Sequence, residues 1–224
     1  MPESIIYQLL QDDVCELILN RPDKINTMNR EMISELSIKL SQIAEQPALR
    51  VVVISGRGHW FCGGADLKWM AAASELEDHA NLEDAKKLAE LFQLLNNLPI
   101  ATIAKVNGGA MGGGIGLLCC CDMVIASENS QYSFGELKLG LLPATIMPYV
   151  LAAIGVRQAR RFMLSAEAFS CQTAKTIGLV HEVVSQAQLE QEATKQIENI
   201  LKTAPQTFRN CKAVIQNTAT GTNS

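Results

Sequence analysis

Glycine is concentrated in two short stretches of this 224-residue chain. Four of the fifteen glycines lie within residues 56–64, and six lie within residues 108–116. Each stretch follows an apolar run, at 51–55 or 101–106, and precedes residues that can begin a helix. Glycine adopts backbone conformations that other residues avoid and lets the main chain approach other groups closely. We therefore expect two tight strand-to-helix turns, which restrict the chain to folds that alternate strands and helices.

The apolar runs predict the strands of a layered α/β fold. The runs at 51–55, 101–106 and 122–127 do not alternate apolar with polar residues, which is typical of strands covered on both faces. Alternation at 15–19 predicts a half-buried strand, and we expect the segment at 5–10 to pair with it. Strand, helix and strand then repeat along the chain, as in α/β proteins.

Two helices are expected between these strands. Apolar residues recur at intervals of three and four from 29 to 45, where Asn26 or Thr27 can serve as the N-cap. The same spacing recurs from 88 to 95, ahead of Pro99. Small and acidic residues with weak periodicity at 71–84 predict a mobile surface segment beside the first glycine cluster.

The pattern after Pro143 is mostly helical. It predicts a short strand within 180–184 and helices at 145–163, 170–176, 186–202 and 204–216. We therefore divide the chain into a sheet-bearing core at 1–150, which holds the candidate site, and a helical region at 151–224. The uncharged run 139–156 has the length of a membrane span, but Pro143 and Pro148 interrupt it. A buried loop and helix are expected there.

Composition excludes several classes of function. Nineteen Lys and Arg against twenty-three Asp and Glu give a net charge of −4, which supplies no general field for nucleic acid or anionic lipid. The N-terminal segment carries acidic residues where a secretory signal needs basic ones, so we expect a cytoplasmic protein. Cys119, Cys120 and Cys121 are consecutive and the three histidines are scattered, so small core cysteines and no metal site are expected.

The second glycine cluster does not fit a nucleotide-binding loop. In a G-x-G-x-x-G frame, Leu117 or Cys119 stands in place of the third glycine, and no G-x-x-x-x-G-K-[ST] run occurs. Such a loop can still bring backbone N–H groups to a ligand at the positive end of a helix. Asp66 can cap a helix after the first cluster in the same way. The two clusters together favour an anion or oxyanion site over glycines that only permit close packing.

Three motifs in order resemble the enoyl-CoA hydratase/isomerase (crotonase) family: FCGGADL at 61–67, NGGAMGGGIGL at 107–117 and FGELKLGLLP at 134–143. The R-P-D-K-x-N segment at 21–26 also fits. The resemblance implies an α/β fold, a crotonase-like spiral of ββα units with a helical C-terminal part. It implies an acyl-CoA thioester as substrate, with coenzyme A as part of that substrate and no separate cofactor. It also implies a homotrimer or a dimer of trimers.

The resemblance further implies roles for single residues. The backbone N–H groups of Ala65 and Gly113 would form the oxyanion hole around the thioester carbonyl, and Lys24 and Lys68 would pair with coenzyme A phosphates. Cys62 has no identifiable base, so a lining role is favoured over that of a nucleophile. The residues expected to bind substrate are Lys24, Ile25, Thr27, Cys62, Gly64, Asp66, Leu67, Lys68, Met111, Gly112 and Pro143.

The number of carboxylates bears on the chemistry. Typical hydratases of the family carry two glutamates; here the later one is Glu136, but Gly116 occupies the position of the earlier one. Burial in an apolar pocket can raise the pKa of a glutamate toward the range of an acid/base, so Glu136 is the candidate catalytic acid/base. A surface acid in a turn is the alternative.

The resemblance leaves three functions open. Hydration of a 2-enoyl-CoA ranks first, because the segments at 114–127 and 141–155 resemble the methylglutaconyl-CoA and isohexenylglutaconyl-CoA hydratases of leucine and terpenoid breakdown. Members of that branch also lack an acid at the position of Gly116. An isomerase that moves a double bond with one glutamate ranks second. A non-catalytic acyl-CoA-binding or RNA-binding protein ranks third. The resemblance also implies final helices that complete the trimer and cover the coenzyme A channel, and we expect the tail at 217–224 to stop short of them.

Overall fold

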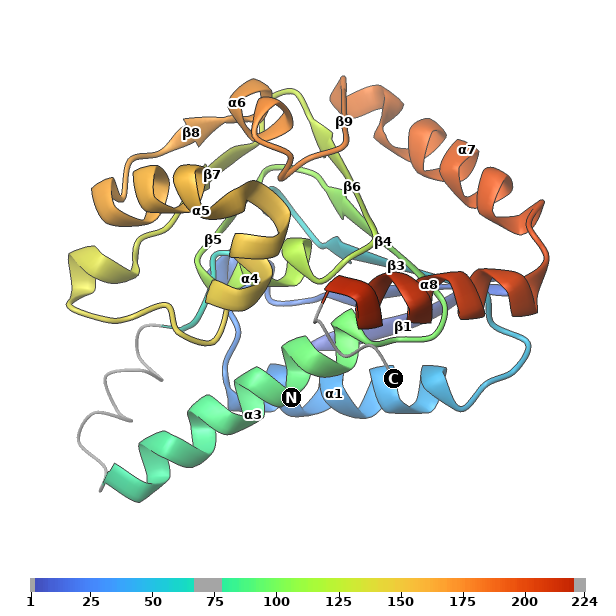
Figure 1. The fold of residues 1–224 in the computed structure, drawn as a ribbon, viewed down its shortest axis with the longest axis horizontal. Coiled ribbons are helices and arrows are strands. Elements are labelled where there is room, and N and C mark those ends of the chain that lie inside the picture. The colour runs from blue at the N-terminus through green and yellow to red at the C-terminus, as the bar shows by residue number, and fades with distance from the viewer. Residues whose placement is uncertain (1–2, 67–77, 220–224) are drawn as a thin grey trace.

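The computed structural model describes residues 3–66 and 78–219, which form two sheets with helices packed around them (Figure 1). The larger sheet has the strand order β1-β2-β3-β4-β6-β9, and the smaller sheet has the order β5-β7-β8. The strands of the larger sheet are β1 (Ile5–Gln11), β2 (Val14–Leu19), β3 (Val51–Gly56), β4 (Ala101–Val106), β6 (Met123–Ser127) and β9 (Glu182–Val184). Those of the smaller sheet are β5 (Gly109–Met111), β7 (Gln131–Ser133) and β8 (Phe169–Ser170).

From β2 to β9 the larger sheet is parallel, and β1 pairs antiparallel with β2 at its edge. The five strands expected before residue 128 are confirmed, and so is the short strand expected within 180–184. The pattern did not predict the three short strands β5, β7 and β8.

One expectation about β2 was wrong: every residue of the strand is buried except Ile18, which is half-buried, so burial does not alternate. Glu16 is only 7% exposed, and its carboxylate accepts hydrogen bonds from Ser55 Oγ at 2.7 Å and pairs with Lys105 Nζ at 3.0 Å. Lys105 also pairs with Glu190 at 2.6 Å. Because a charge can be buried when it is paired and hydrogen-bonded, a polar residue in this strand does not mark a solvent face.

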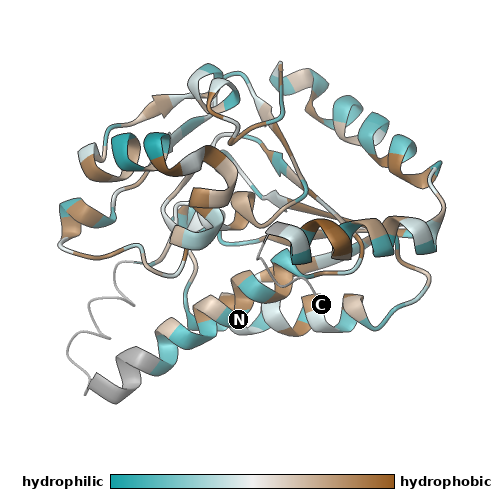
Figure 2. Cartoon of the chain, in the orientation of Figure 1, coloured by the Kyte–Doolittle hydropathy of each residue, from teal (hydrophilic) through white to brown (hydrophobic). Residues whose placement is uncertain are grey.

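The helices lie on both faces of the larger sheet. They are α1 (Arg30–Ala44), α3 (Asp78–Asn96), α4 (Gly113–Cys119), α5 (Met147–Ser165), α6 (Cys171–Thr176), α7 (Leu189–Leu201) and α8 (Pro205–Ala219). Hydrophilic residues of α7 are interrupted by hydrophobic ones along its length (Figure 2), and its buried residues recur at intervals of three and four, as expected of a helix with one apolar face. That face shares a core with the sheet residues Val14, Val51, Val53, Ile103 and Ile125.

The expected helices are confirmed, with two corrections at their starts. The N-cap of α1 is Asn29, whose side chain accepts from Met32 N, and not Asn26 or Thr27. Residues 78–84, expected to be a mobile segment, are the first turns of α3, and Asp84 is buried in an ion pair with Arg30. The remainder of that segment, 71–77, lies outside the described residues.

The run 139–156 is a loop and a helix, as expected, but the loop is not buried. Leu139 is 53% exposed and Leu142 is 83% exposed. None of the helices in residues 3–66 and 78–219 has the length and apolar character needed to cross a membrane. Strands β8 and β9, from the region expected to be helical, complete the two sheets, and the division at residue 150 stays a prediction.

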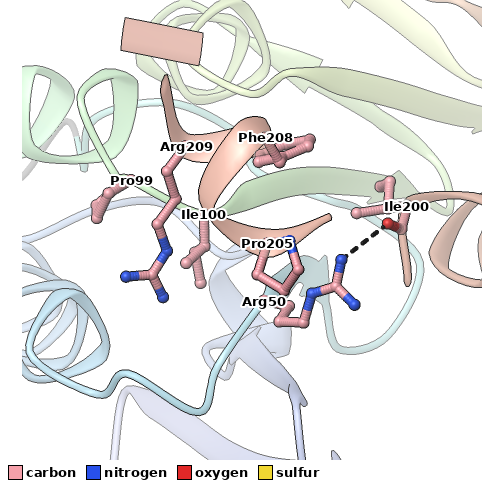
Figure 3. Close-up of a pocket in the computed structure, with 7 residues that line it drawn as sticks. All are labelled: Arg50, Pro99, Ile100, Ile200, Pro205, Phe208 and Arg209. Carbon is pink, nitrogen blue, oxygen red and sulfur yellow. Dashed lines mark hydrogen bonds between the residues drawn. The ribbon is translucent and has the colours of Figure 1, made fainter. Parts of the chain in front are cut away.

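The C-terminal end of helix α7 is held beside the sheet by a half-buried arginine. Arg50, just before β3, donates to the carbonyl oxygens of Ile200 and Leu201, which end α7 (Figure 3). These carbonyls lie at the negative end of the helix dipole, so a cation there is favourable. The cavity beside Arg50 encloses only about 10 Å³, and it is therefore a packing gap with room for no more than about one water molecule.

Candidate active site

The first candidate donor, the N–H of Ala65, lies in a turn that follows β3. Met28 N donates to Gly64 O at 2.7 Å, and Asp66 N donates to Met28 O at 2.8 Å. These bonds form a parallel bridge between Met28 and Ala65, in which the amides on either side of Ala65 face Met28. Peptide groups alternate in direction along an extended chain. The N–H of Ala65 therefore points away from Met28, and it makes no backbone hydrogen bond to another described residue.

The second candidate donor, the N–H of Gly113, is the first amide of α4. Its N-cap is Gly112, and the helix's own hydrogen bonds begin with Gly116 N donating to Gly112 O at 3.1 Å. The first amides of a helix lack intrahelical partners and lie at the positive end of the helix dipole. The N–H of Gly113 makes no backbone hydrogen bond within the described part of the chain.

The two turns face each other at these amides. A methyl group built on Gly64 would lie 3.5 Å from Gly113 N, and one built on Gly113 would lie 3.9 Å from Ala65 N. A parallel bridge between Cys62 and Ala110 holds the turns together. Two N–H donors from separate turns thus border one small space, and such a pair can hold a negatively charged oxygen.

The carboxyl group of Glu136 lies beside the second turn. Glu136 begins a short 3-10 helix after β7, and its Oε1 is 2.5 Å from the place of a methyl group on Gly112. Its Oε2 is buried and has no hydrogen-bond partner among the described residues. Burial raises the pKa of this carboxyl above its ordinary value, partly offset by a hydrogen bond from the backbone of Glu136 itself. A half-buried acid with an unsatisfied oxygen next to two donors is suited to proton transfer.

The position that lacks an acid, Gly116, is enclosed by hydrophobic side chains. A methyl group there would overlap Ile146 Cγ2 and would lie 2.9 Å from Phe92 Cζ. Ile146 and Phe92 are both fully or almost fully buried. Helices α3 and α4 and the N-cap of α5 thus close this space, so the Gly116 position contributes no carboxyl group, and the acid that the structure places beside the second donor turn is Glu136.

The other residues expected at the site are placed as follows. Met111 and Gly112 lie in the second turn, Pro143 is buried ahead of α5, and Lys24 is exposed. The side chains of Ile25 and Thr27 lie over Gly63, where they would obstruct a methyl group. The expected residues Leu67 and Lys68, and the helix that Asp66 was expected to cap, lie outside the described residues.

Cys62 does not have the environment of a nucleophile. Its side chain is fully buried, its thiol donates to Asn26 O at 3.2 Å, and burial raises its pKa to about 12. The thiolate is the reactive form, so this cysteine is inert at neutral pH. It lies behind the first turn, where it supports the backbone.

Several residues that shape this site had no predicted role in it, and Asn26 was expected only as a possible helix cap. Arg21 and Asn26 belong to a segment that was recognised as a motif, but their bonds to residues 57–66 could not be inferred from spacing. Phe92 and Ile146 appeared only as members of apolar patterns. Ser133, whose carbonyl accepts from Gly112 N at 3.1 Å, lies in a strand that the pattern did not predict.

Comparison with known proteins shows the family to which this chain belongs. The family model described as enoyl-CoA hydratase/isomerase matches residues 10–224. The 2,3-dehydroadipyl-CoA hydratase of Escherichia coli is 34% identical over 184 residues, which cover 82% of this chain and 69% of that protein. An enoyl-CoA hydratase of Alternaria alternata is 33% identical over 221 residues, which cover 96% of this chain and 71% of that protein.

Solved structures agree as well. The crystal structure of an enoyl-CoA hydratase from Shewanella pealeana superposes with a TM-score of 0.93 at 35% identity, covering 99% of this chain and 82% of that chain. The expected crotonase-like fold is therefore confirmed. With a family model that matches nearly the whole chain, and with relatives of this identity and coverage, the protein belongs to the enoyl-CoA hydratase/isomerase family of enzymes.

Proposed function

We propose that this enzyme hydrates a 2-enoyl-CoA thioester. The observation that carries the proposal is the buried, unpartnered Oε2 of Glu136 beside two backbone amides that make no backbone hydrogen bond within the described residues. The N–H groups of Ala65 and Gly113 hold the thioester oxygen as it gains negative charge. Each such preorganised donor lowers a barrier of this kind by about 3–4 kcal/mol.

Glu136 relays the proton in this mechanism. Its carboxylate accepts a proton from the attacking water, whose oxygen bonds to carbon 3 of the substrate. The same proton is then delivered to carbon 2, where the electrons of the double bond have been held as an enolate. The elements of water are added in full, and Glu136 ends in its starting state. Its raised pKa suits both halves of the relay.

A second candidate is the isomerisation of a 3-enoyl-CoA to a 2-enoyl-CoA. The closed space at Gly116 favours it, because moving a proton from carbon 2 to carbon 4 requires one carboxyl group. The names of relatives favour hydration: the Escherichia coli relative is a 2,3-dehydroadipyl-CoA hydratase. We rank hydration first. The resemblance of residues 114–127 and 141–155 favours a methylglutaconyl-like acyl group, and the family resemblance favours a homotrimer or a dimer of trimers.

The test compares three substrates with the purified protein. Crotonyl-CoA, 3-methylglutaconyl-CoA and a 3-enoyl-CoA are assayed side by side, by loss or gain of the absorbance of the conjugated thioester. We expect turnover of at least one 2-enoyl-CoA, with 3-methylglutaconyl-CoA preferred. Turnover of the 3-enoyl-CoA alone would replace hydration by isomerisation. Binding of crotonyl-CoA without turnover of any of the three would leave a non-catalytic acyl-CoA-binding protein.

A further inference from the structure

The chain is strained beside the first donor turn. Ile25 and Asn26 are consecutive residues with positive φ, at 46° and 54°, although neither is glycine. Non-glycine residues avoid this region, and they persist there only where the surrounding structure holds them. Ile25 O accepts from Gly63 N at 2.8 Å, and Asn26 O accepts from the Cys62 thiol. The strained turn is therefore bonded directly to the turn that carries Ala65.

The side chain of Asn26 holds this conformation. Asn26 is fully buried, and its Oδ1 accepts from Arg21 N at 2.9 Å. Its Nδ2 donates to Arg57 O at 2.9 Å and to Trp60 O at 2.7 Å. The side-chain amide of Asn26 thus joins its own turn to the segment 57–60 that leads into the first donor turn. All of its partners are main-chain atoms. Because only an amide offers an acceptor and two donors on one planar group of this size, the position demands asparagine.

The side chain of Arg21 closes the other end of the turn. One guanidinium nitrogen donates to the carbonyl oxygen of Thr27. The other pairs with Asp66 Oδ2 at 2.9 Å, and the two side chains are 19% and 15% exposed. Asp66 is the residue after Ala65, and Thr27 is the residue before Met28, which bonds on both sides of Ala65. The planar guanidinium of Arg21 therefore connects Thr27 with Asp66. These residues adjoin Met28 and Ala65, the two members of the bridge that orients the Ala65 amide.

From these bonds we infer that Arg21 and Asn26 are positioning residues that aim the N–H of Ala65 at the thioester oxygen. The inference rests on the proposed function, since it concerns the donor that function requires. Neither side chain touches the reacting atoms. A donor displaced by a fraction of an ångström holds the oxyanion less well, while the affinity for the rest of the substrate changes little.

The experiment compares two conservative variants with two matched controls. Asn26→Asp keeps the acceptor for Arg21 N but removes both donated bonds, and Arg21→Lys keeps the charge but not the planar fork. The controls Asn20→Asp and Arg57→Lys make the same chemical changes at nearby positions. The side chain of Asn20 donates to Glu3 O, and that of Arg57 donates to Asn20 Oδ1, so neither side chain bonds to the donor turn in these contacts. The readouts are kcat and KM for the accepted enoyl-CoA, and the infrared carbonyl stretch of that bound thioester labelled with carbon-13.

We expect kcat to fall about 10- to 100-fold in N26D and R21K, with KM changed less than about threefold. The bound carbonyl stretch should move toward its value in free solution, and both controls should match the parent. A substrate analogue in which a thioether replaces the thioester has no carbonyl oxygen. Its affinity should be unchanged in all four variants. R21K serves as the test if N26D does not fold.

The outcomes separate this inference from the proposed function. If the parent protein polarises the bound carbonyl and turns it over, but the variants do so equally well, Arg21 and Asn26 do not position the donor. If kcat falls while the carbonyl stretch stays at the parent value, the residues act elsewhere and the inference is also wrong. If the parent itself shows neither polarisation nor turnover, it is the proposed function that fails.

Discussion

At the scale of single residues, the carboxyl group of Glu136 couples activity to stability. Burial raises its pKa above the ordinary carboxyl value in the folded protein, so the folded state holds this proton more tightly than the unfolded state. As pH rises from the ordinary carboxyl range through the folded-state pKa, the free energy of unfolding falls. We expect E136Q to be free of this loss, so that its stability relative to the parent increases across that window and then stays constant.

The measurement is urea unfolding of E136Q and the parent at a series of pH values, together with the rate at neutral pH. The rate should fall about 10²- to 10⁴-fold, the usual contribution of an acid/base group. Glu128→Gln is the control, because Glu128 is exposed and makes no ion pair within the described residues. Loss of stability in E136Q at every pH would show that the carboxylate is structural.

Gly112 is required by two independent constraints. Its φ is +45°, and a methyl group on it would lie 2.5 Å from Glu136 Oε1. We expect G112A to lower stability by about 1–3 kcal/mol through backbone strain and to reduce the rate by pushing the carboxyl group away. Gly135→Ala is the matched control, because Gly135 has a φ of −86° and no atom within 4 Å of an added methyl group. Thermal unfolding and the hydration assay check both variants, and a G112A enzyme with the parent's rate would contradict the proposed geometry.

The donors and the acid proposed for this site can be identified from sequence motifs, but the residues that support them cannot. Ala65, Gly113 and Glu136 follow motifs in which each residue is defined by its immediate neighbours. Asn26 and Arg21 act on partners 31 to 45 positions away, which no local pattern reveals. The N-cap of α1 shows the same limit: Asn26 and Asn29 are both good caps, and only the tertiary structure shows that Asn26 is used elsewhere.

At the scale of elements, prediction succeeded where burial imposes a long apolar run or a helical repeat of apolar residues. Strands β3, β4 and β6 are five or six residues long and apolar, and α7 repeats its apolar residues at helical spacing. Strands β5, β7 and β8 have two or three residues each, and β5 lies within the second glycine cluster. Segments this short have no period, so their pairing is decided by the rest of the fold.

The approach of three helices at Gly116 leads to an element-scale prediction. Because Phe92 of α3 and Ile146 at the start of α5 fill the space over this glycine, a second glutamate cannot be accommodated. We expect G116E to be destabilised by about 1–3 kcal/mol and not to gain hydration activity. Adding Phe92→Ala should make the two changes non-additive, with the double variant more stable than the sum of the single effects predicts.

Urea unfolding of the parent, both single variants and the double variant gives the coupling free energy. Gly135→Ala again serves as the control for a change of glycine in an open position. A G116E protein as stable as the parent and faster in hydration would show that the space opens, and that the enzyme can use two carboxylates.

At the scale of the whole molecule, the C-terminal region and the sheet share one core. Strand β9 extends the larger sheet, and the apolar face of α7 packs on its strands. Two cations add polar contacts between this region and the sheet: Arg50, just before β3, bonds the end of α7, and Lys212 of α8 pairs with Asp122 at 2.7 Å and donates to Ile100 O. Regions connected in this way are expected to unfold together.

This cooperativity can be tested by substituting Ile197, which is 6% exposed on the inner face of α7. We expect I197A to lower the free energy of unfolding by about 2–4 kcal/mol because of the cavity it leaves. If the chain unfolds as one unit, hydrogen exchange should then accelerate equally for the slowest amides of β3 and of α7. Glu198→Ala, at the exposed neighbouring position, should leave both unchanged. Faster exchange in α7 with β3 unaffected would instead show that residues 151–224 open as a separate unit.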